Sequence, residues 1–327
     1  MAARLSLFSL RSGEALAERV ARNLGIRPGA HEERDFEWGQ HKTRPLESVR
    51  GSDVYVVQSL HGEAALSVND KLCRLLFFLG ALRDAGADRV TAVVPFLCYA
   101  RKEQRTKPRD PVITRYVASI FEAVGVECVV TVEVHNVAAF QNAFRCRTEH
   151  LDAGRVFAEY FATQLADQRL AVVSPDFGGI KRAERFRDVL SRRMGREIPG
   201  GFIQKRRSEG VVSGDAVVGD VEGRTILLID DMISGGTTIA RAATACRRAG
   251  ALKVVAAAAH GAFVPEAAST LAAAPIDRIA VLDHIPPAAL PAALVSEKLW
   301  LLDSAALLAE AIRRLHEGGS LTDLLEG

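Results

Sequence analysis

The segment ILLIDDMISGGTT, residues 226–238, has the residue types of a site for a sugar phosphate. Its apolar start predicts a strand. Its small residues let backbone N–H groups close on an anion at the start of a helix, where the helix dipole adds positive charge. Asp230 and Asp231 can accept hydrogen bonds from sugar hydroxyls. The alternative is that these acids only end a strand and that Thr238 only caps a helix. The hydroxyl donors of the turn are Ser234, Thr237 and Thr238.

Two basic segments lie elsewhere in the chain. Lys205 and Arg207, in GFIQKRRSEG, are two residues apart, so in an extended stretch they project from the same face. The segment RKEQRTKPRDP, residues 101–111, holds five basic residues. A solvated surface turn is the alternative for the first segment, and a nucleic-acid patch is the alternative for the second. The small size of the second segment, its lack of aromatic residues and the near-neutral chain argue against nucleic acid.

Short runs rich in Val and Ile predict the strands that must carry these residues. The runs alternate with helical patterns, which is typical of parallel sheets covered on both faces. Leucines at the helical spacing within residues 72–79, and apolar residues at the same spacing within 239–246 before Gly250, predict two of the helices. We therefore expect an α/β fold with ligands at the carboxyl ends of its strands. The predicted strands are 53–59, 89–96, 127–134, 170–176, 225–230 and 252–259.

The length of 327 residues predicts two domains. The same order of strand, polar loop and helix occurs before and after about residue 150, so we expect domains at 1–150 and 151–327, with the boundary in residues 147–155. A net charge of +2 excludes a global field that would attract nucleic acid or an anionic membrane. No apolar run reaches the length of a signal peptide or a membrane span, which indicates a cytoplasmic protein without a membrane partner.

The five cysteines lie far apart in the sequence and form no C-x-x-C pair. This spacing indicates reduced thiols rather than disulfides or a zinc site. Apolar neighbours predict that each thiol is buried. The cysteines are Cys73, Cys98, Cys128, Cys146 and Cys246.

Motifs along almost the whole chain resemble those of the ribose-phosphate pyrophosphokinase, or PRPP synthetase, family. The turn at 226–238 is similar to the PRPP-binding signature that this family shares with phosphoribosyltransferases. Further motifs in the family's order are VRGSDVYVVQS at 49–59, VVPFLCYAR at 93–101, TVEVHN at 131–136, VVSPDFGGIKRA at 172–183, VVGDVEGRTILLIDDM at 217–232 and LLAEAIRRLHEGGSLTDLL at 307–325. The resemblance implies two phosphoribosyltransferase-like (type I) domains, each a mostly parallel sheet flanked by helices, with the last helix packing back on the N-terminal domain.

The resemblance also implies a reaction, its ligands and its residues. The β,γ-diphosphoryl group of ATP would pass to the C1 hydroxyl of ribose 5-phosphate with the help of Mg²⁺, giving PRPP and AMP. The implied catalytic residues are Lys205 and Arg207. The implied ribose 5-phosphate site is Asp230, Asp231, Ser234, Gly235, Gly236, Thr237 and Thr238. The implied nucleotide site is Phe36, Trp38, Gln40, Arg101, Lys102 and Glu103, with 101–111 as a mobile loop. The implied metal residues are His135 and Asp176. We also expect a homo-oligomer with the nucleotide site near a subunit interface.

Several positions depart from the family's pattern. FEWGQ at 36–40 stands where FxDGE is usual, so adenine meets fewer acceptors and a second aromatic ring. Ser234 replaces an acid of the usual DDxxD, and a hydroxyl cannot serve as a base near neutral pH. Lys102 replaces a usual Gln, and His284 stands in VLDHIP where TNTIP is usual. His284 is either an ordinary contact near a phosphate or simply an exposed side chain.

Alternatives remain for one metal residue and for the protein. Magnesium prefers oxygen ligands, so His135 can act through nucleotide phosphate or water, or it can be a buried histidine bonded to backbone. A non-catalytic regulatory subunit and a phosphoribosyltransferase are the alternative functions. The joint presence of Lys205, Arg207, His135 and Asp176 favours an enzyme, and the full-length resemblance disfavours a simple transferase.

Overall fold

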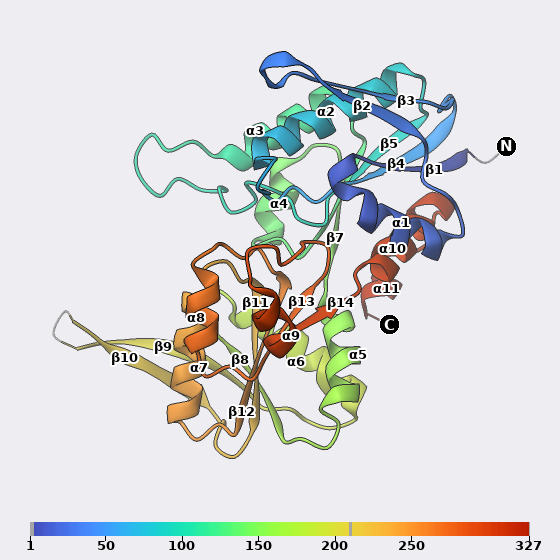
Figure 1. The fold of residues 1–327 in the computed structure, drawn as a ribbon. Coiled ribbons are helices and arrows are strands. Elements are labelled where there is room, and N and C mark those ends of the chain that lie inside the picture. Colours follow the sequence, from blue (N-terminus) through green and yellow to red (C-terminus); the bar gives the residue numbers. More distant parts are fainter. Residues whose placement is uncertain (1–2, 209–210, 327) are drawn as a thin grey trace. The chain divides into compact units, whose positions relative to one another are not determined.

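The computed structural model describes residues 3–208 and 211–326; the side chains of 205–208, 211–215, 325 and 326 lie outside this description. The chain forms two compact units (Figure 1). Unit 1 contains the residues up to Asp152 and a returning segment at 304–325, and unit 2 contains Ala153–Asp303. The division falls within the segment 147–155. The first part of that segment is a strand rather than a linker.

Unit 1 is built on a five-stranded parallel sheet of order β1-β4-β5-β6-β7. The strands are β1 Arg4–Ser9, β4 Ser52–Val57, β5 Arg89–Val93, β6 Cys128–Val132 and β7 Arg147–Leu151. The α-helices are α1 Glu14–Leu24, α2 Val68–Asp84, α3 Ile113–Ala123, α4 Val137–Ala143, α10 Ala305–Glu317 and α11 Thr322–Glu326. A short 3₁₀ helix, η1 Arg11–Gly13, leads into α1. The apolar core lies between the sheet and helices such as α2, whose Leu75 and Leu79 are fully buried.

A small antiparallel hairpin is attached to unit 1. It consists of β2 His31–Asp35 and β3 His41–Pro45, joined by a 3₁₀ turn, η2 Glu37–Gly39. Its strands carry charged residues, and the pair Arg44–Glu32, with 2.6 Å between Nε and Oε2, crosses from one strand to the other. Apolar periodicity did not predict this hairpin, because the side chains that it buries, such as Glu33, His41 and Thr43, are polar.

Unit 2 contains a seven-stranded sheet of order β10-β9-β8-β11-β12-β13-β14, parallel except for β10. The strands are β8 Leu170–Ser174, β9 Gly200–Ser208, β10 Val211–Gly219, β11 Thr225–Met232, β12 Lys253–His260, β13 Arg278–Leu282 and β14 Leu299–Leu302. The helices are α5 Gly154–Gln164, α6 Ile180–Met194, α7 Thr237–Arg248, α8 Ala267–Ala273 and α9 Ala292–Lys298. Its core includes Ile226, Leu228 and Val254.

These elements confirm the α/β prediction and the parallel sheets flanked by helices. Each of the six predicted strands is present, with bounds that differ by a few residues, and the two predicted helices are α2 and α7. No helix in the described part of the chain is long and apolar enough to cross a membrane.

The prediction that every cysteine is buried is wrong for Cys73. Cys98, Cys128 and Cys246 are buried, Cys146 is half-buried, and Cys73 is exposed. Cys73 lies on α2 between Leu72 and Leu75, which face the core, but its own position on the helix points to the opposite side, like that of the exposed Phe77. Helical position, not the apolar character of neighbours in the sequence, decides burial here.

Candidate active site

The sheet of unit 2 has a point where the order of its strands reverses. After β8 the chain forms β9, which lies on one side of β8 in the sheet. It later forms β11, which lies on the other side of β8. Ligands in open α/β sheets bind at the carboxyl ends of the two strands that flank such a point. Asp176 follows β8, and Asp230 and Asp231 end β11. The sheet therefore brings these predicted acids to the same edge.

Arg182, on the first turns of α6, joins the two acids of β11. Its Nη1 lies 3.6 Å from Oδ1 of Asp230 and 3.7 Å from Oδ1 of Asp231. All three side chains are largely buried, at 12% exposure for Arg182, 18% for Asp230 and 6% for Asp231. A single guanidinium thus offsets part of the negative charge of two adjacent carboxylates. Without it the two carboxylates would repel each other strongly, because few water molecules solvate them.

The protonation of Asp230 reflects this arrangement. Burial raises the pKa of Asp230 to about 7, the hydrogen bond and charge of Asp231 add to the rise, and Arg182 opposes it. Two carboxylates that share one site hold a proton between them up to an unusually high pH. Near neutral pH the pair can therefore offer both a donor and several acceptors to the hydroxyls of a sugar.

The predicted phosphate turn follows the acids directly. Gly236 has φ of 80° and precedes the first residue of α7, which has no side-chain cap. The alternative that Thr238 caps this helix is therefore wrong; Thr238 is exposed, and so is Thr237, while Ser234 and Gly235 are half-buried. The backbone N–H of Ile233 donates to the carbonyl of His260 and fixes the start of the turn. The uncapped amides of the first turn of α7 can receive a phosphate.

Asp176 lies in a tight turn between β8 and α6. Its Oδ1 accepts a hydrogen bond from the N–H of Gly179 at 3.0 Å, and its carbonyl accepts one from the buried Ser174 Oγ at 2.6 Å. A Cβ at Gly179 would lie 2.7 Å from that Oγ, so the turn requires glycine there. The half-buried carboxylate is a hard oxygen ligand, and magnesium commonly uses one or two carboxylates together with water and substrate phosphates. Asp176 therefore fits the implied metal.

In unit 1 the predicted aromatic residues lie on the turn of the small hairpin. Phe36 is 44% exposed and Trp38 is 96% exposed. Trp38 has φ of 61°, and the N–H of Phe36 donates to the carbonyl of Gln40 at 2.8 Å. The guanidinium of Arg34 lies over the Phe36 ring, 5.2 Å from its centroid. The turn thus presents two rings, of which the Trp38 ring is almost fully solvated within this chain.

The other predicted nucleotide residues follow β5 of the same unit, and the predicted metal residue His135 follows β6. Arg101 and Lys102 are exposed, and Glu103 is half-buried. Nδ2 of Asn136 donates to Oε1 of Glu103 at 3.0 Å, which links the loop to the segment after β6. His135 is exposed, so the alternative of a buried histidine is wrong.

The predicted catalytic pair, Lys205 and Arg207, lies on β9, where the two residues are paired across the antiparallel ladder with Asp215 and Val212 of β10. Their side chains are outside the described part of the structure. The backbone confirms the extended conformation that the prediction assumed.

Next to the acids of β11, two histidines form a buried pair. Nδ1 of His260, the last residue of β12, lies 2.8 Å from Nε2 of His284, so one ring donates to the other. His284 is 3% exposed, so the alternative of a simply exposed side chain is wrong. A contact of His284 with a phosphate stays a prediction.

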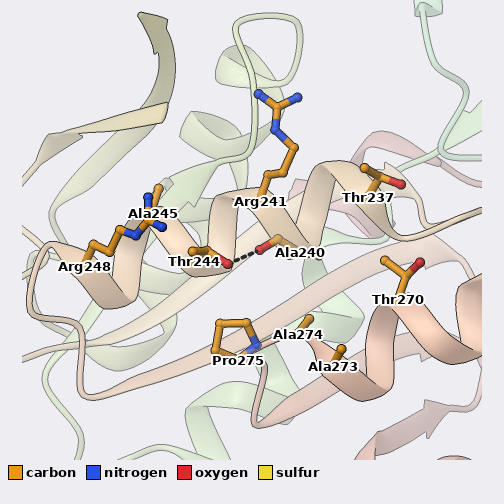
Figure 2. Close-up of a pocket in the computed structure, with 10 residues that line it drawn as sticks. All are labelled: Thr237, Ala240, Arg241, Thr244, Ala245, Arg248, Thr270, Ala273, Ala274 and Pro275. Atoms are coloured by element: carbon orange, nitrogen blue, oxygen red, sulfur yellow. Dashed lines mark hydrogen bonds between the residues drawn. The ribbon is translucent and has the colours of Figure 1, made fainter. Parts of the chain in front are cut away.

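A separate hollow of about 500 Å³ lies between α7 and α8 (Figure 2). It begins at Thr237, the first residue of α7, and extends to Arg248. Alanines and Pro275 form much of its lining, and the hydroxyl of Thr244 is used internally, by the carbonyl of Ala240. Its other polar lining residues are Thr237, Arg241, Arg248 and Thr270.

Sequence reasoning missed some of these residues. Arg182 belongs to an arginine-rich helix in which nothing distinguishes it from its neighbours; only the fold shows that it faces Asp230. Asn136 stands beside His135, where a polar residue before a helix signals an N-cap but not a partner for Glu103.

The chain is similar to known proteins over almost its whole length. Residues 5–125 match the family described as the N-terminal domain of ribose phosphate pyrophosphokinase, and residues 209–326 match the phosphoribosyl synthetase-associated domain. The chain is 36% identical over 324 residues to ribose-phosphate pyrophosphokinase 1 of Listeria monocytogenes, covering 99% of this chain and 98% of that protein. It is 37% identical over 330 residues to ribose-phosphate pyrophosphokinase of Mycobacterium leprae, covering 99% and 96%.

A solved structure is similar over the same length. The crystal structure of phosphoribosylpyrophosphate synthetase from Mycobacterium smegmatis matches with a TM-score of 0.86 and 35% identity, covering 97% of this chain and 100% of that one.

Proposed function

The chain belongs to the ribose-phosphate pyrophosphokinase family, and from this premise we infer that it transfers the β,γ-diphosphoryl group of ATP to the C1 hydroxyl of ribose 5-phosphate. The products are PRPP and AMP. The observation in the structure that best supports this activity is the acid pair Asp230 and Asp231, which lies directly before the uncapped helix start at Gly236. Such a site offers partners to a sugar and to a phosphate at once.

In our proposal the turn after β11 holds ribose 5-phosphate. The 5-phosphate binds the amides and hydroxyls of Ser234, Gly235, Gly236, Thr237 and Thr238. Asp230 and Asp231 accept hydrogen bonds from the ribose hydroxyls, and Arg182 keeps the two carboxylates together. Because Ser234 contributes no charge, this site carries less negative charge than one with a third acid, which lowers the repulsion toward an incoming polyphosphate.

The nucleotide residues of the proposal lie in unit 1. Phe36 and Trp38 offer rings for stacking on the base, with Gln40 beside them on the same turn, and Arg101 and Lys102 offer cations for phosphates. Asp176 would hold Mg²⁺, with His135 acting through phosphate or bound water. When bound, the metal neutralises part of the charge of the phosphates and orients them.

The chemical step is a displacement at the β-phosphorus of ATP. The C1 oxygen of ribose 5-phosphate forms a bond to this phosphorus, the bond from the phosphorus to the oxygen that bridges to the α-phosphate breaks, and the C1 hydroxyl releases its proton. AMP departs with the bridging oxygen. The transferred group carries several negative charges, so cations that act only in the transition state contribute most. We assign that role to Lys205 and Arg207 of β9.

We further propose a cytoplasmic homo-oligomer in which the nucleotide site lies near a subunit interface. The support is the hairpin turn of unit 1, where the exposed rings of Phe36 and Trp38 would leave a base stacked on one side only unless another subunit covered it. Light scattering of the purified protein with and without a nucleotide analogue measures the assembly.

The alternatives of a regulatory subunit and a phosphoribosyltransferase gain no support from the relatives, which are named as pyrophosphokinases or synthetases over the full length of the chain. The deciding experiment incubates the protein with Mg²⁺, ATP and ribose 5-phosphate, and identifies the products by mass spectrometry. We expect AMP and PRPP in equal amounts. ADP in place of AMP would indicate transfer of a single phosphoryl group, and no product with any nucleotide would refute the enzyme.

Lys205→Ala separates binding from catalysis in the same assay. We expect a loss of turnover with nearly unchanged binding of ribose 5-phosphate. Lys253→Ala, at an exposed lysine that starts β12, is the matched control and should keep full turnover.

A further inference from the structure

The beginning of the loop at 101–112 is held from the side of α2 and α3. Tyr99 has φ of 60°, a conformation that is unfavourable for a residue with a side chain. Its hydroxyl donates to Oδ1 of Asn69 at 2.5 Å, and its carbonyl accepts from Oγ1 of Thr114 at 2.8 Å and from the N–H of Lys102 at 2.9 Å. These contacts compensate the strain and fix the direction in which the loop leaves the sheet.

Four residues beyond Tyr99, and one past Lys102, Glu103 meets the segment that follows β6. Asn136 there uses both ends of its amide. Oδ1 accepts the N–H of Ala139 at 3.2 Å and caps α4, while Nδ2 donates to Oε1 of Glu103 at 3.0 Å. Because the cap fixes the amide, the contact restrains Glu103 relative to the backbone that carries His135.

The second carboxylate oxygen of Glu103 has a different environment. Oε2 is buried and has no hydrogen-bond partner among the described residues. A buried carboxylate oxygen without a donor destabilises the folded protein, so its position needs a reason. With Oε1 held by Asn136, Oε2 is the acceptor that a bound donor can use.

We infer that Asn136 is a positioning residue for nucleotide binding: it orients Glu103 so that Oε2 accepts a hydrogen bond from the bound nucleotide. This inference rests on the proposed function, because it places the nucleotide beside the loop at 101–112. The donor is an N–H of the base or a water of the nucleotide-bound magnesium. Both are hydrogen-bond donors to a carboxylate, and the experiment separates them.

The test compares substitutions that divide the two roles of Asn136. Asn136→Ser keeps an oxygen that can cap α4 but removes the donor to Glu103, and Asn136→Asp keeps the cap while placing a negative charge against Glu103. We expect Asn136→Ser to raise the KM for ATP by about five- to tenfold, consistent with the loss of a hydrogen bond to a charged group, and Asn136→Asp to raise it further. The KM for ribose 5-phosphate and the melting temperature should stay close to the wild-type values.

Glu103→Gln supplies the second half of a double-mutant cycle. If Asn136 acts through Glu103, the effects of Asn136→Ser and Glu103→Gln on the KM for ATP are not additive. Asn142→Ser, the same change at an exposed position on α4, is the control and should be neutral. An unchanged KM for ATP, an equal rise in both KM values, or additive effects would overturn the inference.

Two further measurements identify the donor and keep the inference separate from the proposed function. ITP lacks the amino group of ATP, so loss of the preference for ATP over ITP in Glu103→Gln indicates the base, whereas a raised magnesium requirement indicates a metal-bound water. If the wild type forms no AMP, the proposed function fails. Calorimetric binding of a non-hydrolysable ATP analogue then decides the role of Asn136, since unchanged affinity in Asn136→Ser would refute it.

Discussion

Nη1 of Arg182 lies 3.6 Å from Oδ1 of Asp230, so a cation of α6 sets the charge state of an acid on β11. Burial raises the pKa of Asp230 to about 7, whereas Arg182 and the hydrogen bond from the backbone N–H of Asp231 act to lower it. Arg182→Met should therefore raise this pKa further and move the acid limb of kcat/KM for ribose 5-phosphate to higher pH, by about one unit. Arg182→Lys keeps a charge and should shift the limb less. A pH profile that is the same in all three proteins would contradict this role.

Asp230→Asn should change the pH dependence of stability. In the folded state the pKa of Asp230 is about 7, which lies above the ordinary aspartate value of 3.8, so the folded state holds the proton more tightly. The stability that this proton contributes is complete below about pH 4 and is lost as pH rises through about 7. Asparagine does not ionise, so the variant should be more stable than the wild type at pH 8, by about 1–2 kcal/mol, and similar to it at pH 4.

Thermal unfolding of the ligand-free proteins at both values of pH measures the effect of Asp230→Asn. Glu222→Gln, at an exposed acid before β11, is the control and should show no such dependence. The same difference in melting temperature at pH 4 and pH 8 would show that Asp230 is not protonated near neutral pH. Binding of ribose 5-phosphate should weaken in the variant despite its stability.

Gly236→Ala and Gly235→Ala form a matched pair in the phosphate turn. A Cβ at Gly236 would lie 2.7 Å from Cδ2 of Leu271 in α8, and its φ of 80° disfavours any side chain. A Cβ at Gly235 would have only Val264 Cγ2 nearby, at 3.9 Å. We expect Gly236→Ala to lower the unfolding free energy of the ligand-free protein by about 2 kcal/mol, and Gly235→Ala to change it little. Equal melting temperatures for the two variants would contradict the tight packing of the turn on α8.

Asp53→Asn should loosen the returning helices of unit 1. This buried carboxylate accepts hydrogen bonds from Arg89 at 2.5 Å, from Nδ1 of His316 on α10 at 2.8 Å and from the hydroxyl of Tyr55 at 3.1 Å. Asparagine lacks the negative charge that these donors share, so the substitution should lower the free energy of unfolding by about 2 kcal/mol. We expect a lower melting temperature and faster proteolysis after residue 303. Asp84→Asn, at an exposed acid at the end of α2, should do neither.

Much of the fold follows from the sequence, because buried parallel strands require continuous apolar runs. Residues 225–230 and 252–259 are such runs, and they form neighbouring strands. The small hairpin and the β9–β10 ribbon escape this reasoning, because neither contains a continuous apolar run: the hairpin strands are mostly charged, and Ser, Gly and Asp interrupt the valines of β10. Cys73 shows the same limit in a helix, where one step along the chain turns a side chain from the core to the surface.

The site residues that lie together in one short segment could be predicted from the sequence. The site residues that only folding brings together could not. Asp230 and Asp231 stand directly before the turn that completes their site, so spacing alone indicates a sugar phosphate. Arg182 reaches the same acids from 48 positions away in the chain, and nothing in its neighbourhood marks it. The hydrogen bond between Asn136 and Glu103 joins separate loops, so the sequence did not predict it either.

The return of residues 304–325 to unit 1 also sets an order of events during synthesis. A ribosome produces the whole of unit 2 before the segment that completes unit 1 emerges. Until then the apolar face of α1, with Leu16 and Val20, lacks its contact with α10. We therefore expect unit 2 to fold first. Unit 1, although most of it is translated earlier, should stay incompletely folded and bind chaperones until residues 304–325 have been synthesised.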